Sequence, residues 1–341
     1  MSFRVWGSLD MRLPLAEVSA QARRAETLGC DVVMLADVAF DAFLGAQAAI
    51  LATKQVQVAT SGLVCFARSP MVTAVASWNL AALSGGRFRL GLSALVPPML
   101  VGKYSVSWHP PAPRMREYIG ALKAIHDSWQ TDVPLRYEGQ YYRLNRQNWW
   151  TRPAPIEHPD IPIHLGAIGP HMCVVAGECA RGLLTHPTNV GPRYVREVVI
   201  PQVAKGAQRA GRSTEDFELV VTPQYATGTT ASEIAAQRER CRGLLATLLS
   251  TPQYWPTLEL YGWRATGERL LGLWREGRQD LMPAELTEEM LDVLVVTAPY
   301  DRLAQALKDR FGNIARGMCI RLPPDSANDA TLGRVIRELQ E

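Results

Sequence analysis

The sequence predicts an α/β fold, a (β/α)8 or TIM barrel that carries insertions. Short runs such as 31–36 are apolar without alternation, which is typical of strands buried on both faces of a parallel sheet. These runs alternate with helical stretches and yield eight strands, which favours a closed barrel over an open doubly wound sheet. The 341 residues are 47% hydrophobic. They suffice for one domain over 1–341, because such barrels have roughly 200 to over 400 residues.

The first half of the predicted barrel has short connections. Phe3–Gly7 is expected to be the first strand and 14–28 a helix, because Pro14 suits a first helical turn and Gly29 suits a helix end. The expected elements that follow are a strand at 31–36, a helix at 44–53, a strand at 56–63, a helix at 70–84, a strand at 88–92 and a helix at 114–129.

Two stretches interrupt this alternation. Residues 94–113 contain five prolines and no helical period, and we interpret them as a long functional loop over the mouth of the barrel. Residues 135–144 predict a hairpin that turns at Glu138-Gly139, followed by an irregular connector. The segment 135–160 is therefore a second insertion.

The second half of the chain resumes the alternation and carries a third insertion. Residues 251–290 are expected to be this insertion, helical and bearing Trp255, Trp263 and Trp274. Around it we expect strands at 161–167, 182–185, 217–226 and 318–322, and helices at 170–180, 193–210, 231–249, 300–311 and 331–340.

Composition argues against several classes of protein. Thirty-six basic and thirty-three acidic residues leave a net charge of +3 with scattered arginines, which is not the footprint of a nucleic-acid-binding protein. No apolar run approaches the roughly 18 residues of a membrane span, and the N-terminus does not resemble a signal peptide. The six cysteines form no Cys-x-x-Cys pair, and the six histidines have no metal-ligand spacing. We therefore expect a cytoplasmic protein with no metal, membrane or nucleic-acid partner.

Small residues end the third and fourth predicted strands, where the mouth of a barrel lies. Ser61-Gly62 follows the third strand, and Ser93 follows the fourth. Loops at the carboxyl ends of the strands carry the chemistry in this architecture, and small residues there let backbone lie against a flat ring. These strand ends therefore predict a cofactor site, with simple turn formation as the alternative.

The segment 166–171 predicts a phosphate site. Gly166-Ala167 ends the fifth strand, and Pro170 opens a helix directly after Gly169. The first N–H groups of a helix have no partner within it and point outward with the positive end of the helix dipole, which suits an anion. An ordinary strand-to-helix turn has a similar sequence and stays open as the alternative.

Five segments, in order along nearly the whole chain, resemble the bacterial-luciferase-like oxidoreductases. The resemblance is closest to the branch assigned to the deazaflavin coenzyme F420. The segments are Ala22–Asp31, Phe66–Ala74, Ser84–Phe88 with Leu90–Leu92, Pro113–Tyr118, and Gly169–Pro170 with Ala176–Glu178.

The resemblance implies a luciferase-like barrel that binds a flavin or deazaflavin at the carboxyl ends of its strands and moves hydride to or from the ring. It implies a non-prolyl cis peptide at Ser61-Gly62, with Leu63 beside it, against the ring; an ordinary trans bond is the alternative. Relatives of this kind suggest a homodimer. Ser93 takes the place of a small hydroxyl residue, and the phosphate site would comprise Gly166, Ala167, Gly169 and His171.

Three residues are candidates for acid–base chemistry. His186 follows the sixth strand and is the first choice for a proton donor, because an imidazole titrates near neutral pH. Asp37 stands where the resemblance implies an acidic or polar residue, but Val38 follows it where deazaflavin sugar dehydrogenases have histidine. His109, beside Trp108, is the second choice among the histidines. A structural histidine and a helix-capping aspartate are the alternatives.

Further residues are expected to surround the substrate and the coenzyme tail. Lys103, Arg114 and Arg116 are candidates to meet an anionic tail, although Arg114 is also spaced to pair with Glu117. The expected apolar walls of the substrate pocket are Trp6, Phe40, Trp108 and Tyr225.

The sequence therefore predicts an F420-dependent oxidoreductase that exchanges hydride between the deazaflavin and a small organic substrate held under the 94–113 loop. A luciferase-like monooxygenase that uses reduced FMN and oxygen is the first alternative, because the fold and the phosphate site serve either ring. A barrel that binds cofactor without catalysis is the second, suggested by Val38 and by Pro98 in place of polar residues of some relatives.

Overall fold

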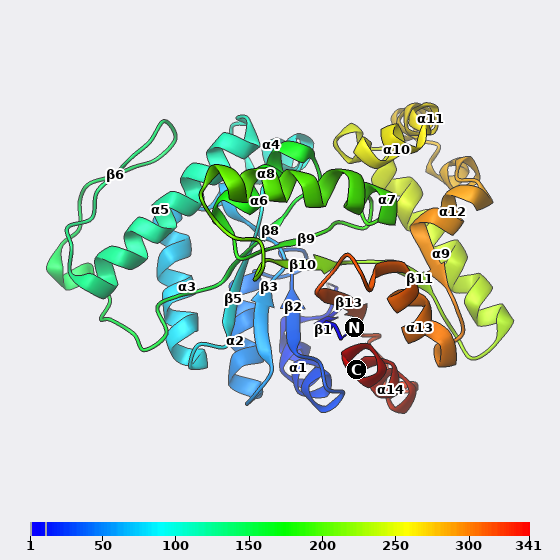
Figure 1. Cartoon of the computed structure of the whole chain (residues 1–341), viewed down its shortest axis with the longest axis horizontal. Coiled ribbons are helices and arrows are strands. Elements are labelled where there is room, and N and C mark those ends of the chain that lie inside the picture. The colour runs from blue at the N-terminus through cyan, green and yellow to red at the C-terminus, as the bar shows by residue number, and fades with distance from the viewer. Residues whose placement is uncertain (1, 11) are drawn as a thin grey trace.

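Eight parallel strands close into a barrel in the computed structural model, which describes residues 2–10 and 12–341 (Figure 1). The ring runs from β1 through β2, β3, β5, β8, β9 and β10 to β13, which pairs with β1. The predicted (β/α)8 barrel is confirmed. Its strands are β1 (Arg4–Ser8), β2 (Val32–Leu35), β3 (Gln57–Thr60), β5 (Phe88–Ser93), β8 (Ile163–Gly166), β9 (Gly182–Leu184), β10 (Glu218–Val221) and β13 (Gly317–Arg321).

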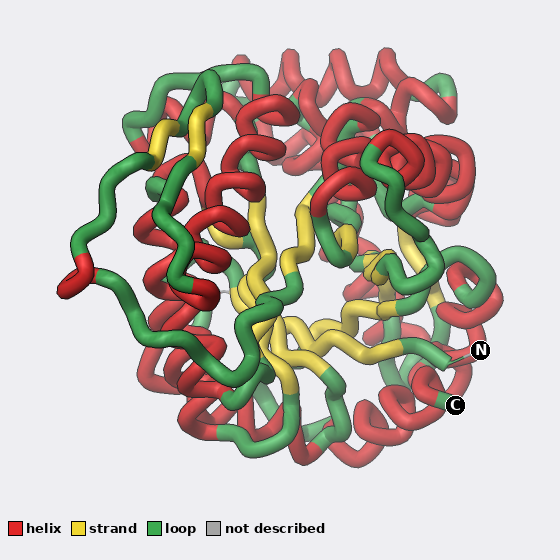
Figure 2. The backbone as a smooth tube through the Cα atoms, turned by 60° about the vertical axis from the view of Figure 1, so that its left-hand side comes forward, coloured by secondary structure: helices red, strands yellow, loops and turns green. Residues whose placement is uncertain are grey.

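Helices surround the strands, as Figure 2 shows in red around the yellow centre. Outward-facing strand residues such as Val33, Val58 and Ile320 are buried beneath these helices in one extended apolar core. This burial explains the unbroken apolar runs of the sequence. The surrounding helices are α1 (Val18–Thr27), α2 (Ala42–Ala52), α3 (Pro70–Ser84), α5 (Pro111–Thr131), α6 (Pro170–Cys179), α8 (Ile200–Arg209), α13 (Tyr300–Phe311) and α14 (Asp329–Gln340). The short helix α7 (Pro192–Tyr194) precedes α8.

Inward-facing side chains fill the barrel in levels, because successive residues of a strand point to opposite faces. Nearer the amino-terminal ends, Arg89 of β5 donates to Glu218 of β10 across the interior (2.8 Å), and His164 of β8 lies 3.1 Å from the same carboxylate. The next level is apolar and forms a cluster of its own: Trp6, Val32, Met34, Ala59, Leu184, Val220 and Cys319. The barrel is therefore packed below its mouth.

Two strand predictions were wrong at the carboxyl ends. β3 stops at Thr60, and β4 (Leu63–Val64) then pairs with β5. The strand expected over 217–226 breaks at Pro223, which has no N–H for the ladder of the barrel. Beyond it, β11 (Gln224–Ala226) leaves the barrel and pairs with β12 (Val295–Thr297), a strand that was not predicted.

The 94–113 insertion contains a helix, contrary to the predicted irregular loop. α4 (Pro97–Tyr104) has Pro97 and Pro98 in its first turn, where a missing N–H costs no helical hydrogen bond. Ser105 ends the helix in the left-handed conformation (φ 55°). The proline content that suggested a loop is thus compatible with a helix start.

The other two insertions have the predicted secondary structure. The hairpin of β6 (Tyr137–Glu138) and β7 (Arg143–Leu144) is antiparallel and extends at the left of Figure 1. The third insertion is helical and packs with α9 (Ala231–Leu249) around a second apolar core. Its helices are α10 (Pro256–Tyr261), α11 (Arg264–Arg275) and α12 (Glu288–Leu294).

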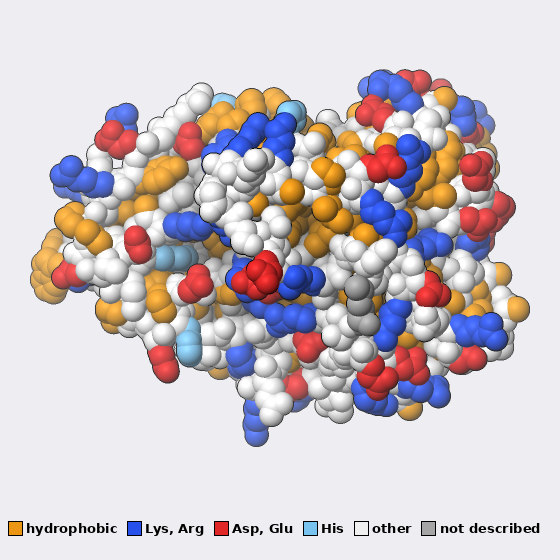
Figure 3. All heavy atoms as spheres, viewed as in Figure 1, with side chains coloured by type: hydrophobic (Ala, Val, Ile, Leu, Met, Phe, Trp, Pro, Cys, Tyr) orange, Lys and Arg blue, Asp and Glu red, His pale blue; other side chains and the backbone are white. Residues whose placement is uncertain are grey.

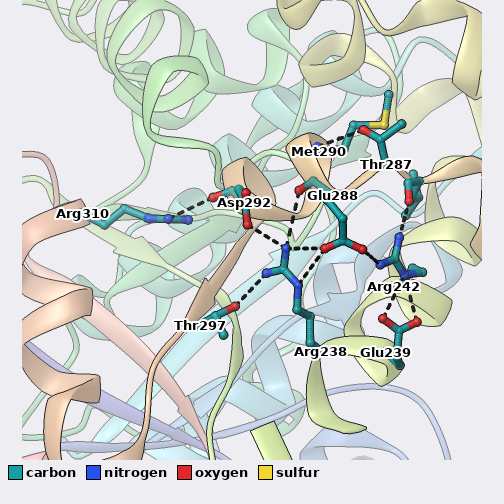
Figure 4. Close-up of polar contacts among 10 residues, drawn as sticks. Arg238, Glu239, Arg242, Thr287, Glu288, Met290, Asp292, Thr297 and Arg310 are labelled. Atoms are coloured by element: carbon teal, nitrogen blue, oxygen red, sulfur yellow. Dashed lines mark hydrogen bonds and ion pairs between the residues drawn. The ribbon is translucent and has the colours of Figure 1, made fainter. Parts of the chain in front are cut away.

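Ion pairs join α9 to α12 (Figure 4). Arg238 of α9 contacts Glu288 (2.9 Å) and Asp292 (2.7 Å) of α12, and Arg242 contacts the same Glu288. The two carboxylates are mostly exposed, so each pair alone adds little stability, and the shared network matters more. These contacts hold α12 against α9, and Arg238 also donates to Thr297 of β12 (2.8 Å).

The surface carries both signs of charge. Figure 3 shows basic and acidic side chains interspersed over the face in view. Among residues 2–10 and 12–341, no helix combines the length and the apolar character that crossing a bilayer requires. The six cysteines are free thiols, and all but Cys179 are buried.

Acid is expected to destabilise the fold through His126. Its ring is buried on α5 beside Trp78 and Trp129, at centroid distances of 5.2 and 5.9 Å, and burial lowers its pKa to about 4. In the unfolded chain the ring binds a proton below its ordinary pKa of 6.5. Stability that is fully present above pH 6.5 is therefore lost as the pH falls toward 4. The expected loss at pH 4 is about 3 kcal/mol.

Urea unfolding at pH 7 and pH 4 measures this loss. His126→Phe fills a similar space without a titrating group, so its free energy of unfolding should fall about 3 kcal/mol less than that of the wild type. Glu218 affects both proteins alike: burial opposes its ionisation, but His164 and Arg89 lower its pKa to about 2. Equal losses in the two proteins would contradict the assignment to His126.

Candidate active site

The peptide bond between Ser61 and Gly62 is cis, as the resemblance implied, and it lies where β3 ends. A Cβ atom on Gly62 would lie 2.7 Å from the Cβ of Ser93, the last residue of β5, so this approach requires glycine. Leu63, predicted to contact the ring, is completely buried beside them. The structure therefore brings Ser61, Gly62 and Ser93 together at the barrel mouth.

β3 and β5 approach each other closely just below this point. The Thr60 hydroxyl accepts a hydrogen bond from the Gly91 N–H and donates one to the Gly91 carbonyl, both at 2.9 Å. A Cβ atom on Gly91 would lie 1.9 Å from the Thr60 carbonyl oxygen. The absence of a side chain at Gly91 thus lets β3 reach the position from which the Ser61-Gly62 peptide faces the mouth.

Asp37 holds this part of the mouth together, and its carboxylate is occupied by hydrogen bonds. Its side chain is 4% exposed and accepts bonds from the N–H of Val64 in β4 (2.7 Å) and of Ala42 in α2 (2.8 Å). Arg68 donates to both carboxylate oxygens (2.8 and 3.3 Å) and also pairs with Asp41 (2.6 Å). These contacts agree with the helix-capping alternative for Asp37, and its acid–base role stays a prediction.

The loop from β8 to α6 presents free N–H groups. Gly169 caps α6 without a side-chain hydrogen bond, and the N–H groups of Gly169 and His171 have no partner among the described residues. The space beside Gly169 is open, with no atom within 4 Å of a Cβ position. Gly166 ends β8, and Ala167 is buried behind the loop. The residues predicted to bind phosphate therefore lie together at one helix N-terminus.

His186 follows β9 and is stacked on Tyr254 of the third insertion, with ring centroids 4.6 Å apart. Burial lowers the pKa of His186 to about 4, so the ring is neutral at pH 7. Nδ1 lies 2.9 Å from the Thr188 hydroxyl and accepts from the Thr188 N–H (3.4 Å), which leaves the ring proton on Nε2. His186 is thus a neutral imidazole that can donate a hydrogen bond from Nε2, and its role as proton donor stays a prediction.

Trp108 and His109 lie on the segment between α4 and α5. Trp108 is 46% exposed, and His109 is exposed with its ring 5.8 Å from that of Tyr141 on the hairpin. Lys103 is exposed on α4 with its ammonium over the Tyr104 ring. No hydrogen bond or ring contact within 2–10 and 12–341 joins these three to Ser61 or His186. The structure leaves their roles as predictions.

Three of the four expected wall residues have structural contacts. Trp6 is completely buried in the inner core, 5.1 Å from the His164 ring, so it does not line an open pocket as predicted. Phe40 covers Gly45 of α2 and is partly buried. Tyr225 is buried, and its hydroxyl accepts from the Arg321 N–H (2.9 Å), filling the gap where β10 turns away from β13. The exposed Trp108 is the fourth.

The two arginines of α5 are occupied by other contacts. Arg114 stacks its guanidinium on Phe66 (4.3 Å) and donates to the Tyr142 hydroxyl (3.0 Å). Arg116 pairs with Glu178 of α6 (2.6 Å). The Arg114–Glu117 pair does not form, because Glu117 accepts instead from the hairpin N–H groups of residues 140 and 141. Both arginines therefore connect structural elements, and the predicted contact with a coenzyme tail lacks support.

Sequence reasoning missed Asn189 and Arg321. The fully buried amide of Asn189 donates to the Ala167 carbonyl (2.9 Å) and accepts from the His186 N–H (2.6 Å), so it joins the phosphate loop to the histidine loop. No local signal marks it, because its partner Ala167 is 22 residues away. Arg321 ends β13 at the mouth. The strand-end argument did not find it, because that argument selects small residues and the predicted strand ran to residue 322.

Fold and site together define a (β/α)8-barrel enzyme whose chemistry takes place at the carboxyl ends of the strands. Residues 1–315 match the model of the luciferase-like monooxygenase family, and the chain belongs to this family. The protein is accordingly an oxidoreductase of the luciferase-like class.

Relatives of known sequence or structure are consistent with this membership. The uncharacterized protein Rv1360 of Mycobacterium tuberculosis (strain ATCC 25618 / H37Rv) is 34% identical over 304 residues, which are 89% of each chain. The 5,10-methylenetetrahydromethanopterin reductase of Archaeoglobus fulgidus is 25% identical over 250 residues, 71% of this chain and 69% of the relative. The solved coenzyme F420-dependent tetrahydromethanopterin reductase of Methanopyrus kandleri has a TM-score of 0.80 at 19% identity, covering 100% and 99% of the two chains.

Proposed function

We propose that this protein is an F420-dependent oxidoreductase that transfers hydride between the deazaflavin and a small organic substrate. The observation that carries the proposal is the close approach of Gly62 to Ser93 at the mouth, at the same end of the barrel as the open N-terminus of α6. This arrangement offers one site for a flat ring, at Gly62 and Ser93, and a separate site for a phosphate, at the N-terminus of α6. The reductase relatives support the deazaflavin as the ring.

The residues at the mouth fit the parts of this coenzyme. The Ser61-Gly62 peptide and Ser93 offer a surface of backbone and small side chains to the ring. The free N–H groups of Gly169 and His171 offer hydrogen bonds to the phosphate, and the open space at Gly169 admits it. When bound, the deazaflavin accepts or supplies a hydride.

His186 is the proposed partner of the reacting substrate atom. Its neutral ring holds the proton on Nε2 and is fixed by Thr188 at Nδ1 and by the Tyr254 ring. A hydrogen bond from Nε2 to a substrate oxygen would stabilise negative charge that develops there during hydride transfer. Because the pKa of His186 is about 4, it supplies this hydrogen bond without becoming a cation at neutral pH.

Two insertions are the proposed cover of the substrate. The third insertion contributes Tyr254, which packs on His186, and the 94–113 segment contributes the exposed Trp108. Excluding water strengthens hydrogen bonds such as that from His186 and protects the hydride. Since the insertion supplies a residue of the site, we also propose that residues 1–341 act as one domain.

A monooxygenase that uses reduced FMN is the second candidate. The family to which the chain belongs is named for monooxygenases, and FMN also has a flat ring and a phosphate. The same two sites at Gly62 and Gly169 fit it, so binding affinity is the property that distinguishes the candidates.

A side-by-side titration of the full chain with F420 and FMN tests the proposal. We expect saturable binding of F420, weaker binding of FMN, and a loss of F420 affinity of about 10-fold or more in Gly169→Asp, whose carboxylate would repel the phosphate. Gly102→Asp, at an open position of α4, is the matched control and should bind like the wild type. Absence of F420 binding would refute the proposal, and tighter binding of FMN would select the monooxygenase.

A homodimer is proposed from the outer faces of α2 and α3, which pack beside each other. Apolar side chains are exposed along both helices at helical spacing, which favours an interface. They are Leu44, Leu51, Val72, Val75 and Leu83, between 39% and 66% exposed. Sedimentation velocity of the full chain tests this point, with a dimer as the expected species.

A further inference from the structure

Arg321 occupies a special position at the barrel mouth. It is the last residue of β13 and pairs with Ser8 of β1, on the same side of the sheet as Cys319 in the inner core. Its side chain therefore starts from the inner face of the barrel. The other inward-facing residues that end their strands are uncharged, namely Ser8, Ser93, Gly166 and Leu184. Arg321 brings a full positive charge to this otherwise neutral level.

The guanidinium of Arg321 has only neutral partners. One Nη donates to the Tyr225 carbonyl, the other lies 3.5 Å from the Gln224 amide oxygen, and the group stacks on the Tyr225 ring at 4.4 Å. No carboxylate lies within 4.0 Å of it among the described residues. Two of its five N–H donors have oxygen acceptors, and the group also contacts the Cys241 thiol; the side chain is largely buried and keeps some exposed surface.

Two other buried arginines next to the barrel strands have carboxylate partners. Arg68 pairs with Asp37 and Asp41, and Arg89 pairs with Glu218. Arg87 has no carboxylate either, but it donates to four backbone carbonyls and one hydroxyl at the helix ends around it. A buried cation with unused donors costs free energy unless an anion joins it. Arg321 differs from these three arginines because it has unused donors and no carboxylate partner at the barrel mouth.

We propose that Arg321 binds the carboxylate of the substrate, so that the substrate of the proposed oxidoreductase is an organic acid. This inference rests on the proposed function, because it takes the mouth to be the substrate site. A guanidinium matches a carboxylate with two parallel hydrogen bonds. A single positive charge among neutral residues suits a monoanion better than a phosphate, and the N-terminus of α6 is a separate site for the phosphate of the coenzyme.

Binding of benzoate to the full chain without coenzyme tests this site. Isothermal titration compares benzoate with inorganic phosphate at equal ionic strength. In Arg321→Gln we expect benzoate affinity to fall by about 10-fold or more, the usual loss for a charged hydrogen bond. Arg321→Lys keeps the positive charge but loses the planar guanidinium that can form two parallel hydrogen bonds. Its benzoate affinity should therefore fall by less than that of Arg321→Gln. Arg116→Gln, at a surface arginine of α5, is the control and should leave benzoate affinity unchanged.

The outcomes separate this inference from the proposed function. Unchanged benzoate affinity in Arg321→Gln, with a melting temperature close to that of the wild type, overturns the inference. So does phosphate binding that is tighter than benzoate binding and depends on Arg321. If Arg321→Gln does not fold, equal affinities in Arg321→Lys and the wild type overturn it instead.

F420 titration of the same variants completes the test. We expect Arg321→Gln to bind F420 as the wild type does, because the phosphate and ring sites lie at Gly169 and Gly62. A loss of F420 affinity as large as that of benzoate would place Arg321 in the coenzyme site and overturn the substrate assignment. A wild type that binds benzoate through Arg321 but not F420 refutes the proposed function and leaves the carboxylate site standing.

Discussion

Replacing Asp37 with alanine is expected to lower the free energy of unfolding by about 3 to 5 kcal/mol, because it removes one side of a buried ion pair and leaves two backbone N–H groups without an acceptor. The substitution removes the acceptor of Arg68 and of two backbone N–H groups, those of Ala42 and Val64. It also frees β4 to move, so F420 affinity should fall with stability. Urea unfolding and coenzyme titration of the same preparation measure both effects.

Asp41→Ala is the matched control for this prediction. Asp41 also pairs with Arg68, but its side chain is 39% exposed, and it caps α2 through the N–H of Phe43. Its loss should cost about 1 kcal/mol. An acid–base role for Asp37 predicts the opposite behaviour: Asp37→Asn would keep wild-type stability and coenzyme affinity and lose only turnover. That result would contradict the positioning role.

Gly91→Ala adds one methyl group, and we expect it to destabilise the barrel more than a methyl group added at any other barrel position. The added Cβ would lie 1.9 Å from the Thr60 carbonyl oxygen, and both partners are backbone that cannot rotate away. β3 must then separate from β5, which breaks the two Thr60–Gly91 hydrogen bonds and moves Ser61-Gly62. We expect a loss of about 3 kcal/mol or more in the free energy of unfolding and no measurable F420 binding.

Gly102→Ala shows whether this loss is due to the clash. Gly102 lies within α4 and has no atom within 4 Å of its Cβ position, so alanine there should be neutral or slightly stabilising. The measurement is the urea midpoint of both variants against the wild type. A Gly91→Ala protein as stable as Gly102→Ala would mean that β3 and β5 are not held together in this way.

The barrel could be predicted from the sequence because its strands are buried on both faces. Runs such as Val32–Leu35 are apolar throughout, and helix boundaries such as those of α9 are marked by capping residues, here Thr230 with Glu233. The exceptions depend on pairing between distant segments. β12 is only three residues long, so its sequence carries no recognisable strand pattern. It forms because it pairs with β11.

The candidate site was predictable where backbone and small residues make it. Ser61, Gly62, Ser93 and Gly169 lie at strand or helix ends, and position alone identifies such residues. The roles of polar side chains were not predictable, because contacts distant in sequence set them. Asp37 is occupied by Arg68, 31 residues away, and a tyrosine 68 positions beyond His186 covers that histidine and lowers its pKa.

We propose that the mouth of this barrel seats the ring of a redox coenzyme on the Ser61-Gly62 peptide. A crystal structure of the chain with bound F420 would show where the ring lies. We expect the deazaflavin ring in van der Waals contact with Ser61-Gly62 and Ser93, and the phosphate on the N–H groups of Gly169 and His171. A coenzyme bound elsewhere, for example in the groove lined by Arg4, Arg181 and Arg316 at the opposite end of the barrel, would contradict the account.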